Sequence, residues 1–385
     1  MSPAADRRLI VATHEFHPHR GGIAVYAAEM AAAAAGLGHK VEVWAPALPA
    51  GTVERAWPFK VRRLAMGGSH SLRDQWRMAR ALLRERKAWD HALLYVPEPG
   101  PILALQVLQL IGRLPPGPLV ITLHGSDVLK LGMRPLVSWS ARRLLTRADR
   151  LSVVSRHTQA LLEEFFPGFG SKVVLTPGAL RSDFRPGAGA ARPAGADDKV
   201  IILTVARLHP RKGQLRLIEA LRALEPRQKG RIEYWLAGGH SKEGYEPALQ
   251  AAARDAGFPV KFLGEVDDAE LGGLYAQANI FAMTSVPHKL SVEGFGLVYL
   301  EAGAHGLPVV AHAIGGVPDA VRHDETGLLV PPDDPAALTA ALARLIDDPA
   351  LRRRLGAAGR ELARRHSWAD NALALFGRPG DAGSR

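Results

Sequence analysis

The chain contains no cysteine, and this absence removes several kinds of chemistry at once. Disulfide bonds, thiolate metal ligands and a cysteine nucleophile are excluded, and the composition agrees with a reducing compartment. Long apolar runs are also lacking, because the longest, "PILALQVLQLIG", is shorter than the roughly 20 residues that a membrane-spanning helix needs. A secretory signal has a charged start, an apolar middle and a small-residue cleavage site, and the first residues of this sequence do not show that pattern. We therefore expect no secretory signal and a cytoplasmic protein.

What the chain does have is the composition of an ordinary globular protein of 385 residues, 47% hydrophobic and 23% charged. A single hydrophobic core rarely extends over this length, so we expect two domains. The net charge of +11 is uneven. Residues 1–190 contain 25 Lys and Arg against 14 Asp and Glu, whereas residues 191–385 contain 24 of each kind. An anionic partner is therefore to be sought in the first half.

Short apolar runs alternate with helical patterns in both halves. The runs "LIVATHEF", "HKVEVWAP" and "PLVITLHGSD" are typical of buried strands in the first half, as are "KVIILTVARL", "IEYWLAGG" and "LPVVAHAI" in the second. Strands that alternate with helices predict a parallel sheet covered on both faces. The Gly-, Pro- and Ala-rich stretch 185–198 is typical of a linker. We therefore predict an α/β protein with two doubly wound, Rossmann-like domains.

Open parallel sheets bind ligands beyond the carboxyl ends of their strands, and a cleft between two such domains is the default site. Gly21 and Gly22 follow the first predicted strand and precede a helix, whose N-terminus can hold an anion. An ordinary strand-to-helix turn is equally compatible, and no G-x-G-x-x-G fingerprint of a dinucleotide site is present. "LHGSD" places His124 and Asp127 after another strand, either as substrate-binding or catalytic groups or as the cap of the next helix.

A basic cluster follows the first strand of the second half. "VARLHPRKG" contains Arg207, Arg211 and Lys212 between a strand and a helix. Arg can hold phosphate oxygens with two parallel hydrogen bonds and Lys adds a compact charge, so the cluster suits a diphosphate. A solvated basic turn is the alternative, but the second half is otherwise neutral, which favours a binding role.

Two carboxylates stand close together in "SVEGFGLVYLEAG". Glu293 precedes a predicted helix that starts near Gly294–Gly296, and Glu301 lies inside that helix. The two carboxylates can reach different parts of one extended ligand, and the helix N-terminus between them can donate hydrogen bonds to phosphate. In the alternative interpretation, Glu293 is a charge that complements the helix dipole and Glu301 is a surface residue. The run around Glu301 is too apolar for a surface helix, so its carboxylate needs a partner, such as a ligand hydroxyl.

These segments resemble glycosyltransferase family 4, whose members are retaining enzymes of the GT-B fold. The resemblance rests on "EGFGLVYLEAGAHGLPVVAHAIGGVPDAV" and "TGLLVPPDDPAAL", and on "HPHRGGIAVYAAEMAAAAAGLGHKVEVWAP", "LHGSDV" and "LTVARLHPRKG" in the family's order. It covers nearly the whole chain and is weakest over residues 50–95. It implies an N-terminal acceptor-binding domain over residues 1–185, completed by a crossover helix at about 367–385, and a donor-binding domain over residues 186–366.

The resemblance also implies roles for the candidate residues. Arg207 and Lys212 would hold the donor diphosphate, approached by the Gly21–Gly22 turn; Glu301 would bind the ribose. Glu293 and the backbone of Phe295, Gly296 and Leu297 would contact the donor sugar and phosphate, and His124 would lie at the reaction centre. The catalytic set is then His124, Glu293, Arg207 and Lys212, with Glu98 and Asp127 on the acceptor side.

By the same resemblance, the protein moves a hexosyl group from a UDP- or GDP-sugar to an acceptor hydroxyl in polysaccharide, lipopolysaccharide or glycolipid synthesis. The cations and helix N-termini can stabilise the leaving diphosphate, and no Asp-x-Asp motif is present, so we expect neither a metal ion nor a cofactor. A sugar-nucleotide epimerase or a non-catalytic nucleotide-sugar-binding protein of the same fold is the alternative. A nucleic-acid-binding protein is a further rival, but no recognition motif accompanies the sequence pI of about 10.1.

The basic excess of the first half suggests a further partner. Residues 60–90 contain nine Lys and Arg against three Asp and Glu, with Trp76, Met78, Leu82 and Leu83 among them. A basic helix with apolar positions can lie on an anionic membrane, and "RPLVSWSARRLLTRADR" has the same character. We therefore expect the first domain to dock on the inner face of a membrane or on an anionic, lipid-linked acceptor. A solvated Arg-rich face is the alternative.

Overall fold

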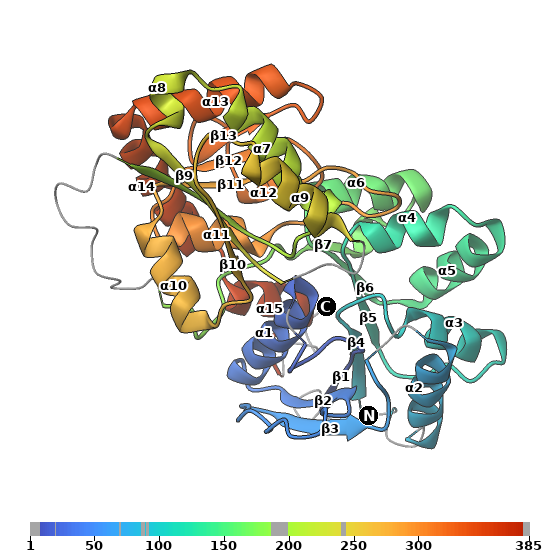
Figure 1. Ribbon diagram of the computed structural model, residues 1–385. Helices are drawn as coiled ribbons and strands as arrows, with labels where there is room; N and C mark the ends of the chain where they lie inside the picture. The colour runs from blue at the N-terminus through green and yellow to red at the C-terminus, as the bar shows by residue number, and fades with distance from the viewer. Residues whose placement is uncertain are drawn as a thin grey trace. The chain divides into compact units, whose positions relative to one another are not determined.

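A parallel sheet forms the centre of each of the two units into which the chain divides. The computed structural model describes residues 8–19, 21–68, 71–85, 89, 92–185, 199–239 and 244–379 (Figure 1). Unit 1 takes in Met1–Ser182 and Ser367–Arg385, and unit 2 takes in Asp183–His366. The linker expected at 185–198 lies outside the described residues, except for Arg185.

In the described residues of unit 1, seven parallel strands pair in the order β3-β2-β1-β4-β5-β6-β7. The elements of this unit are β1 Arg8–Ala12, α1 Gly22–Gly36, β2 Lys40–Pro46, β3 Lys60–Leu64, α2 Leu72–Arg84, β4 Ala92–Val96, α3 Ile102–Leu110, β5 Leu119–Leu123, α4 Ser126–Gly132, α5 Pro135–Arg147, β6 Arg150–Val153, α6 Arg156–Phe165, the short 3₁₀ turn η3 Gly170–Lys172, β7 Val173–Leu175 and α15 Trp368–Phe376.

Strands β1, β4 and β5 are buried over almost their whole length, as expected for a sheet covered on both faces. Alternate strand residues pack with the inner faces of α2, α3, α5 and α6 in one hydrophobic cluster. Helices α1 and α15 pack against each other. Helix α15 is fixed to unit 1 by the Trp368 indole, which donates to the Leu180 carbonyl (2.8 Å), and by Asn371, which donates to the Pro177 carbonyl (2.5 Å).

In unit 2, the described residues form six parallel strands in the order β10-β9-β8-β11-β12-β13. The elements are β8 Val200–Val205, the 3₁₀ turn η4 Pro210–Lys212, α7 Gln214–Arg222, α8 Pro226–Lys229, β9 Ile232–Ala237, α9 Tyr245–Arg254, β10 Val260–Gly264, α10 Asp268–Gln277, β11 Ile280–Met283, α11 Leu297–Ala304, β12 Val309–His312, α12 Val317–Ala320, β13 Gly327–Val330, α13 Pro335–Asp347 and α14 Pro349–Arg365.

Both strand orders reverse direction once, between β1 and β4 in unit 1 and between β8 and β11 in unit 2. This is the Rossmann-like arrangement, and the prediction of two doubly wound α/β domains is confirmed. Loops that follow neighbouring strands on either side of the reversal diverge and leave room for a ligand at the carboxyl edge. The loops after β8 and β11 are therefore the place to look for chemistry in unit 2.

The expectation of a basic helical segment over residues 60–90 is wrong at its start. Residues Lys60–Leu64 form the edge strand β3, which pairs in parallel with β2, and the helix begins only at Leu72. Met78 and Leu82 face the core of unit 1, whereas Trp76 and Leu83 are exposed. Of the helices in the described residues, none combines the length and apolar character that a membrane span requires.

Candidate functional site

Two loops meet at the carboxyl edge of the sheet of unit 2 because β8 and β11 are neighbours in it. The loop after β8 ends at Gly213, which has a φ of +72° and whose Cβ, if it had one, would lie 1.9 Å from the carbonyl oxygen of Thr284 in the loop after β11. The Thr284 hydroxyl donates to the Gly213 carbonyl (2.9 Å), and the Val286 amide donates to the Arg211 carbonyl (2.8 Å). Only glycine combines this backbone conformation with so close an approach.

The sequence "HPRKG" builds the turn that presents the basic side chains. Pro210 occupies the first position of η4, where its fixed φ suits a turn and its missing N–H is not needed. The Arg211 amide donates to Nδ1 of His209 (3.0 Å), which caps the turn. Arg211 and Lys212 follow directly, so both cations project from one rigid turn.

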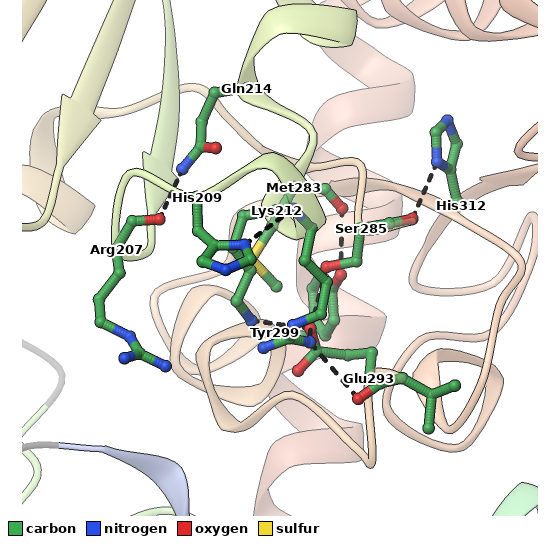
Figure 2. Close-up of polar contacts among 11 residues, drawn as sticks. Arg207, His209, Lys212, Gln214, Met283, Ser285, Glu293, Tyr299 and His312 are labelled. Carbon is green, nitrogen blue, oxygen red and sulfur yellow. Dashed lines mark hydrogen bonds and ion pairs between the residues drawn. The ribbon is translucent and has the colours of Figure 1, made fainter. Parts of the chain in front are cut away.

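One carboxylate oxygen of Glu293 accepts hydrogen bonds from side chains of both loops (Figure 2). Oε2 of Glu293 accepts hydrogen bonds from Arg211 (2.9 Å), from Nζ of Lys212 (2.7 Å) and from the hydroxyl of Ser285 (2.9 Å). Among the described residues Oε1 accepts none, and Glu293 is largely buried. The Glu293 carbonyl accepts from the Gly316 amide (2.8 Å), which ties the carboxylate to the loop after β12. We refer to Arg211, Lys212, Ser285 and Glu293 as the Glu293 cluster.

Ion pairing decides the ionisation of Glu293 in spite of its burial. Burial by itself raises the pKa of this carboxyl, but the charges of Lys212 and Arg211 and the hydrogen bonds from Lys212 and Ser285 lower it to about 2. The pKa of Lys212 is lowered, because burial outweighs the attraction of Glu293 and the Arg211 charge adds to the lowering. Glu293 is therefore an anion at any physiological pH, and it holds two cations close together.

Positive charge remains in excess around the cluster. Arg211 and Lys212 together outweigh the one carboxylate of Glu293, and Arg207 adds a third cation just after β8. The Arg207 side chain is exposed and reaches no partner in the described part of the chain, while its carbonyl accepts from Gln214 (2.9 Å; Figure 2). An exposed guanidinium beside two further cations at a strand end suits an anionic ligand, and the geometry of Arg suits phosphate oxygens.

The start of α11 adds backbone donors to this region. Gly296 precedes the helix with a φ of +90°, and a Cβ there would lie 2.5 Å from the Tyr299 ring. The Tyr299 hydroxyl donates to the Met283 carbonyl (3.0 Å) and so fixes the first turn of the helix against β11. No acceptor in the described residues takes the amides of Phe295, Gly296 and Leu297, as is usual for a helix N-terminus. These amides can bind an anion.

Glu301 has surroundings different from those of Glu293. It is half-buried on α11, and its Oε2 accepts from the hydroxyl of Tyr275 on α10 (2.9 Å). The Tyr275 ring stacks on His305, with ring centroids 4.9 Å apart. The expectation that this carboxylate has a partner is confirmed, and the partner in the structure is the phenol hydroxyl of Tyr275. Its contact with a ribose stays a prediction.

In unit 1, His124 and Asp127 follow β5 as expected. Nε2 of His124 donates to the Pro97 carbonyl (2.8 Å), since a carbonyl can only accept, and the ring packs edge-on against Tyr26 at 5.2 Å. The buried Asp127 carboxylate accepts from the amides of His124 (3.0 Å) and Val128 (2.9 Å). Asp127 thus closes the turn into α4, but it is the second residue of that helix; Gly125 is the N-cap and no side chain caps the helix, so the capping interpretation is wrong in detail. The catalytic role of His124 and the acceptor-side role of Asp127 stay predictions.

Glu98 and the glycine turn lie at the strand reversal of unit 1. The fully buried Glu98 carboxylate accepts from the amides of His14 (2.7 Å) and Gly100, so it joins the loops after β1 and β4. Gly21 precedes α1 in an extended conformation, and Gly22 is the first residue of that helix. The acceptor contact expected of Glu98 and the phosphate approach expected of the glycines also stay predictions.

Ser285 is a site residue that sequence reasoning did not single out, although it follows β11 and the strand-end rule places it at the same edge as Lys212. Arg211 was recognised as part of the basic cluster, but its bond to Glu293 was not foreseen. Within the described residues, no group of three or more His, Asp or Glu side chains is arranged to hold a metal ion.

Comparison with known proteins identifies the family of the chain. Residues 20–180 match the model of "Glycosyltransferase Family 4", and residues 191–362 match that of "Glycosyl transferases group 1". A GDP-mannose-dependent monoacylated alpha-(1-6)-phosphatidylinositol monomannoside mannosyltransferase of Corynebacterium glutamicum is 30% identical over 379 residues, 93% of each chain. A related mannosyltransferase of Mycolicibacterium smegmatis is 36% identical over 253 residues, 64% of this chain and 65% of the relative.

Among solved structures, a sucrose-phosphate synthase from Thermosynechococcus elongatus superposes with a TM-score of 0.79 at 25% identity, covering 95% of this chain and 97% of that one. The two family models cover the two halves in order, and the Corynebacterium relative aligns over nearly the full length of both chains. The chain therefore belongs to glycosyltransferase family 4 and has the GT-B architecture of two Rossmann-like domains.

Proposed function

We propose that the protein transfers a hexosyl group from a nucleoside-diphosphate sugar to a hydroxyl of a glycolipid acceptor, with retention of the anomeric configuration. The observation that carries the proposal is the Glu293 cluster, which holds surplus positive charge at the carboxyl ends of β8 and β11. The Corynebacterium and Mycolicibacterium relatives are named for GDP-mannose and for phosphatidylinositol monomannoside. GDP-mannose is therefore the first donor to test, and UDP-sugars are the second.

The diphosphate of the donor is assigned to the cations and to the helix start. Arg207 offers an exposed guanidinium without a partner in the described residues, Lys212 offers a compact charge, and the amides of Phe295, Gly296 and Leu297 offer hydrogen-bond donors. Negative charge grows on the diphosphate as the bond to the sugar breaks, so donors fixed in advance around it lower the barrier. Because these groups neutralise the leaving group, we propose that no metal ion is needed, and EDTA should leave the rate unchanged.

Glu293 is assigned to the donor sugar. Its Oε2 is committed to three protein donors, whereas Oε1 can accept from a sugar hydroxyl. A carboxylate whose pKa is about 2 is a weak base and a weak nucleophile, which argues against a covalent intermediate on Glu293. In the proposed step the bond between the anomeric carbon and the diphosphate oxygen breaks. The acceptor oxygen then bonds to that carbon from the same face, and its proton passes to the departing diphosphate.

The remaining assignments concern the nucleoside and the acceptor. Glu301, which lies on α11 and accepts from the Tyr275 hydroxyl, would bind the ribose hydroxyls. His124 would face the sugar and the acceptor with Nδ1, since Nε2 is held by the Pro97 carbonyl. A lipid-borne acceptor requires work at a membrane surface, so we propose peripheral association with the inner face of a membrane.

The test is donor turnover by the purified protein. Release of GDP from GDP-mannose is measured with and without a phosphatidylinositol mannoside in detergent, and the anomeric configuration of the product is read by NMR. We expect acceptor-dependent release and an α-product. Glu293→Gln should abolish turnover, whereas Glu233→Gln, which removes another low-pKa carboxylate of unit 2, should not.

Other outcomes contradict the proposal. Conversion of the donor to an isomer without transfer would make the protein an epimerase. Donor binding without release of nucleotide for any acceptor would make it a binding protein. Normal turnover by Glu293→Gln would show that the reaction takes place away from the Glu293 cluster.

A further inference from the structure

Helix α10 is fixed to the rest of unit 2 by one aromatic side chain. Tyr275 is fully buried, and it is the only residue of α10 in that state, since the other residues of the helix are half-buried or exposed. The helix has Gly272 and Gly273 in its middle, and glycine is a poor helix former. The contacts of Tyr275 therefore account for much of the position of α10.

The Tyr275 hydroxyl reaches a carboxylate of the neighbouring helix α11 (Figure 1). It donates to Oε2 of Glu301 at 2.9 Å. The Tyr275 ring stacks on His305, with an angle of 18° between the two rings, and Nδ1 of His305 donates to the Glu301 carbonyl (2.9 Å). His305 follows Glu301 by about one helical turn, on the same side of the helix. Both the ring and the hydroxyl of Tyr275 are thus held by one turn at the end of α11.

The His305 ring that supports Tyr275 is itself fixed and uncharged. Burial lowers the pKa of His305, so its imidazole is neutral at pH 7. The Phe184 ring packs edge-on against it, with ring centroids 5.3 Å apart, and Arg360 on α14 donates to the His305 carbonyl (3.3 Å). Tyr275 therefore lies on a neutral, rigid surface, and the direction of its hydroxyl is set by the fold.

Glu301 lies about one turn beyond the start of α11. The helix begins at Leu297, so Glu301 is about 6 Å along the helix axis from the amides that are assigned above to the diphosphate. In a nucleoside diphosphate the ribose is joined directly to the first phosphate, so a phosphate at the helix start brings the ribose hydroxyls within a side-chain length of Glu301. Glu301 is half-buried, and part of its side chain is therefore open to a ligand.

We propose that Tyr275 is a positioning residue for the nucleotide: its hydroxyl holds the Glu301 carboxylate in the orientation that accepts hydrogen bonds from the 2′- and 3′-hydroxyls of the ribose. This role rests on the proposed function and deepens it, because it names the group that sets the preference for a ribose. A glutamate side chain loses rotamer freedom when it is ordered. The bond from Tyr275 orders it before the nucleotide arrives, so less free energy is lost on binding.

Two other roles fit Tyr275 less well. A platform for the nucleobase would need an open ring face, but the Tyr275 ring is fully buried. An anchor of α10 alone would need only the ring, and a phenylalanine would serve equally. The hydroxyl instead donates to a carboxylate that is partly open to solvent, which favours a role in ligand binding.

The test is calorimetric titration of the full chain with GDP and with 2′,3′-dideoxy-GDP, which lacks both ribose hydroxyls. The wild type should bind GDP about 30-fold more tightly, because hydrogen bonds to a charged group are strong. Tyr275→Phe keeps the ring and removes only the donor, and it should reduce this ratio to about fivefold by weakening the binding of GDP. The affinity for the dideoxy compound should change by less than about twofold. UDP and 2′,3′-dideoxy-UDP should give the same shift, because the ribose is common to both nucleotides.

Matched variants separate the ligand contact from an effect on folding. Tyr234→Phe removes another fully buried phenol hydroxyl of unit 2, one that is bonded to the Thr204 hydroxyl (2.9 Å), and it should keep the ratio of the wild type. Glu301→Gln should reduce the ratio at least as much as Tyr275→Phe does. The double variant should fall no further than Glu301→Gln alone, because the hydroxyl acts through the carboxylate. His305→Ala removes the surface under the Tyr275 ring and should give an intermediate ratio.

An unchanged ratio in Tyr275→Phe would overturn the positioning role, even if the variant were less stable, and so would equal binding of both nucleotides by the wild type. An equal fall of the ratio in Tyr234→Phe would assign the effect to folding. Failure of the proposed function gives a different result: a protein that binds GDP with the expected ratio but transfers nothing contradicts the transfer and leaves the role of Tyr275 intact. A wild type that binds neither GDP nor UDP contradicts both.

Discussion

Replacing Glu293 by Gln tests the centre of the site most directly, because it keeps the shape of the side chain and removes its charge. Gln can still accept from Ser285, but Lys212 and Arg211 then lie beside each other with no anion between them. Both cations are largely buried, at 15% and 16% side-chain exposure, so water replaces little of what is lost. Breaking a buried ion pair by removing one partner is strongly destabilising.

The pKa of Glu293 gives the magnitude. It falls from an ordinary 4.5 to about 2, and each pKa unit corresponds to about 1.4 kcal/mol, so the charged form stabilises the fold by about 3 kcal/mol at pH 7. Because the folded pKa is depressed, this stability is present above about pH 4.5 and is lost as the pH falls through about 2. The difference between the wild type and Glu293→Gln should therefore shrink by about 2 kcal/mol between pH 7 and pH 3.

Differential scanning calorimetry at pH 7 and at pH 3 can follow this difference in stability. Glu233→Gln is the matched control, because the pKa of Glu233 is also lowered to about 2, chiefly by hydrogen bonds from Lys261 and Lys199. Both lysines are about half exposed and regain water when the carboxylate is removed, so we expect a loss below about 1 kcal/mol. The reasoning is refuted if Glu293→Gln is as stable as the wild type at pH 7, or if its deficit is the same at pH 3.

Three further predictions concern single elements of the two units. Arg207→Ala should change the free energy of unfolding by less than about 0.5 kcal/mol, because its side chain is exposed and without a partner in the described residues, yet it should weaken donor binding about tenfold, as titration calorimetry can measure. Gly213→Ala should cost about 2–4 kcal/mol in urea unfolding, because its φ of +72° and its contact with the Thr284 carbonyl both exclude a Cβ; a loss below 1 kcal/mol would contradict the close approach. Asp127→Ala should cost about 1–2 kcal/mol, because it leaves the His124 amide without its acceptor, and faster hydrogen exchange at the start of α4 would report the loss.

Much of the fold follows from local patterns in the sequence. Runs such as "LVITL" and "VIILTV" are apolar except for one threonine each, as is typical of a strand buried on both faces, and each is a strand in the structure. Strand β3 was missed because its basic residues and partial exposure hide the strand period, and its place is decided by pairing with β2. On α2 the sequence shows apolar residues on a basic helix, but which of them face solvent depends on the position of the core.

The candidate site, like the fold, could be predicted from the sequence only in part. The positions of Arg207, Lys212 and Glu293 just after strands identify them as candidates, since strand ends share one edge of a parallel sheet. Their pairing was not predictable, because Arg211 and Glu293 are 82 residues apart and meet only where β8 and β11 become neighbours. The hydrogen bonds of Asp127 and Glu98 to backbone amides were not predictable either, because they depend on turns whose shape the residue types alone do not specify; the acceptor-side roles of both residues stay predictions.

Hydrophobic period and strand ends are local properties of the chain, so they were enough to predict the two parallel-sheet units, the order of the motifs and the carboxyl edge at which the candidate residues lie. The folded structure was needed to show that Oε2 of Glu293 accepts from Arg211, Lys212 and Ser285, and that Glu301 is bonded to Tyr275. It was also needed to show that the Tyr275 ring stacks on His305. These are contacts between segments distant in the chain, and their energies depend on burial and on the distance between charges, which exist only after the chain has folded.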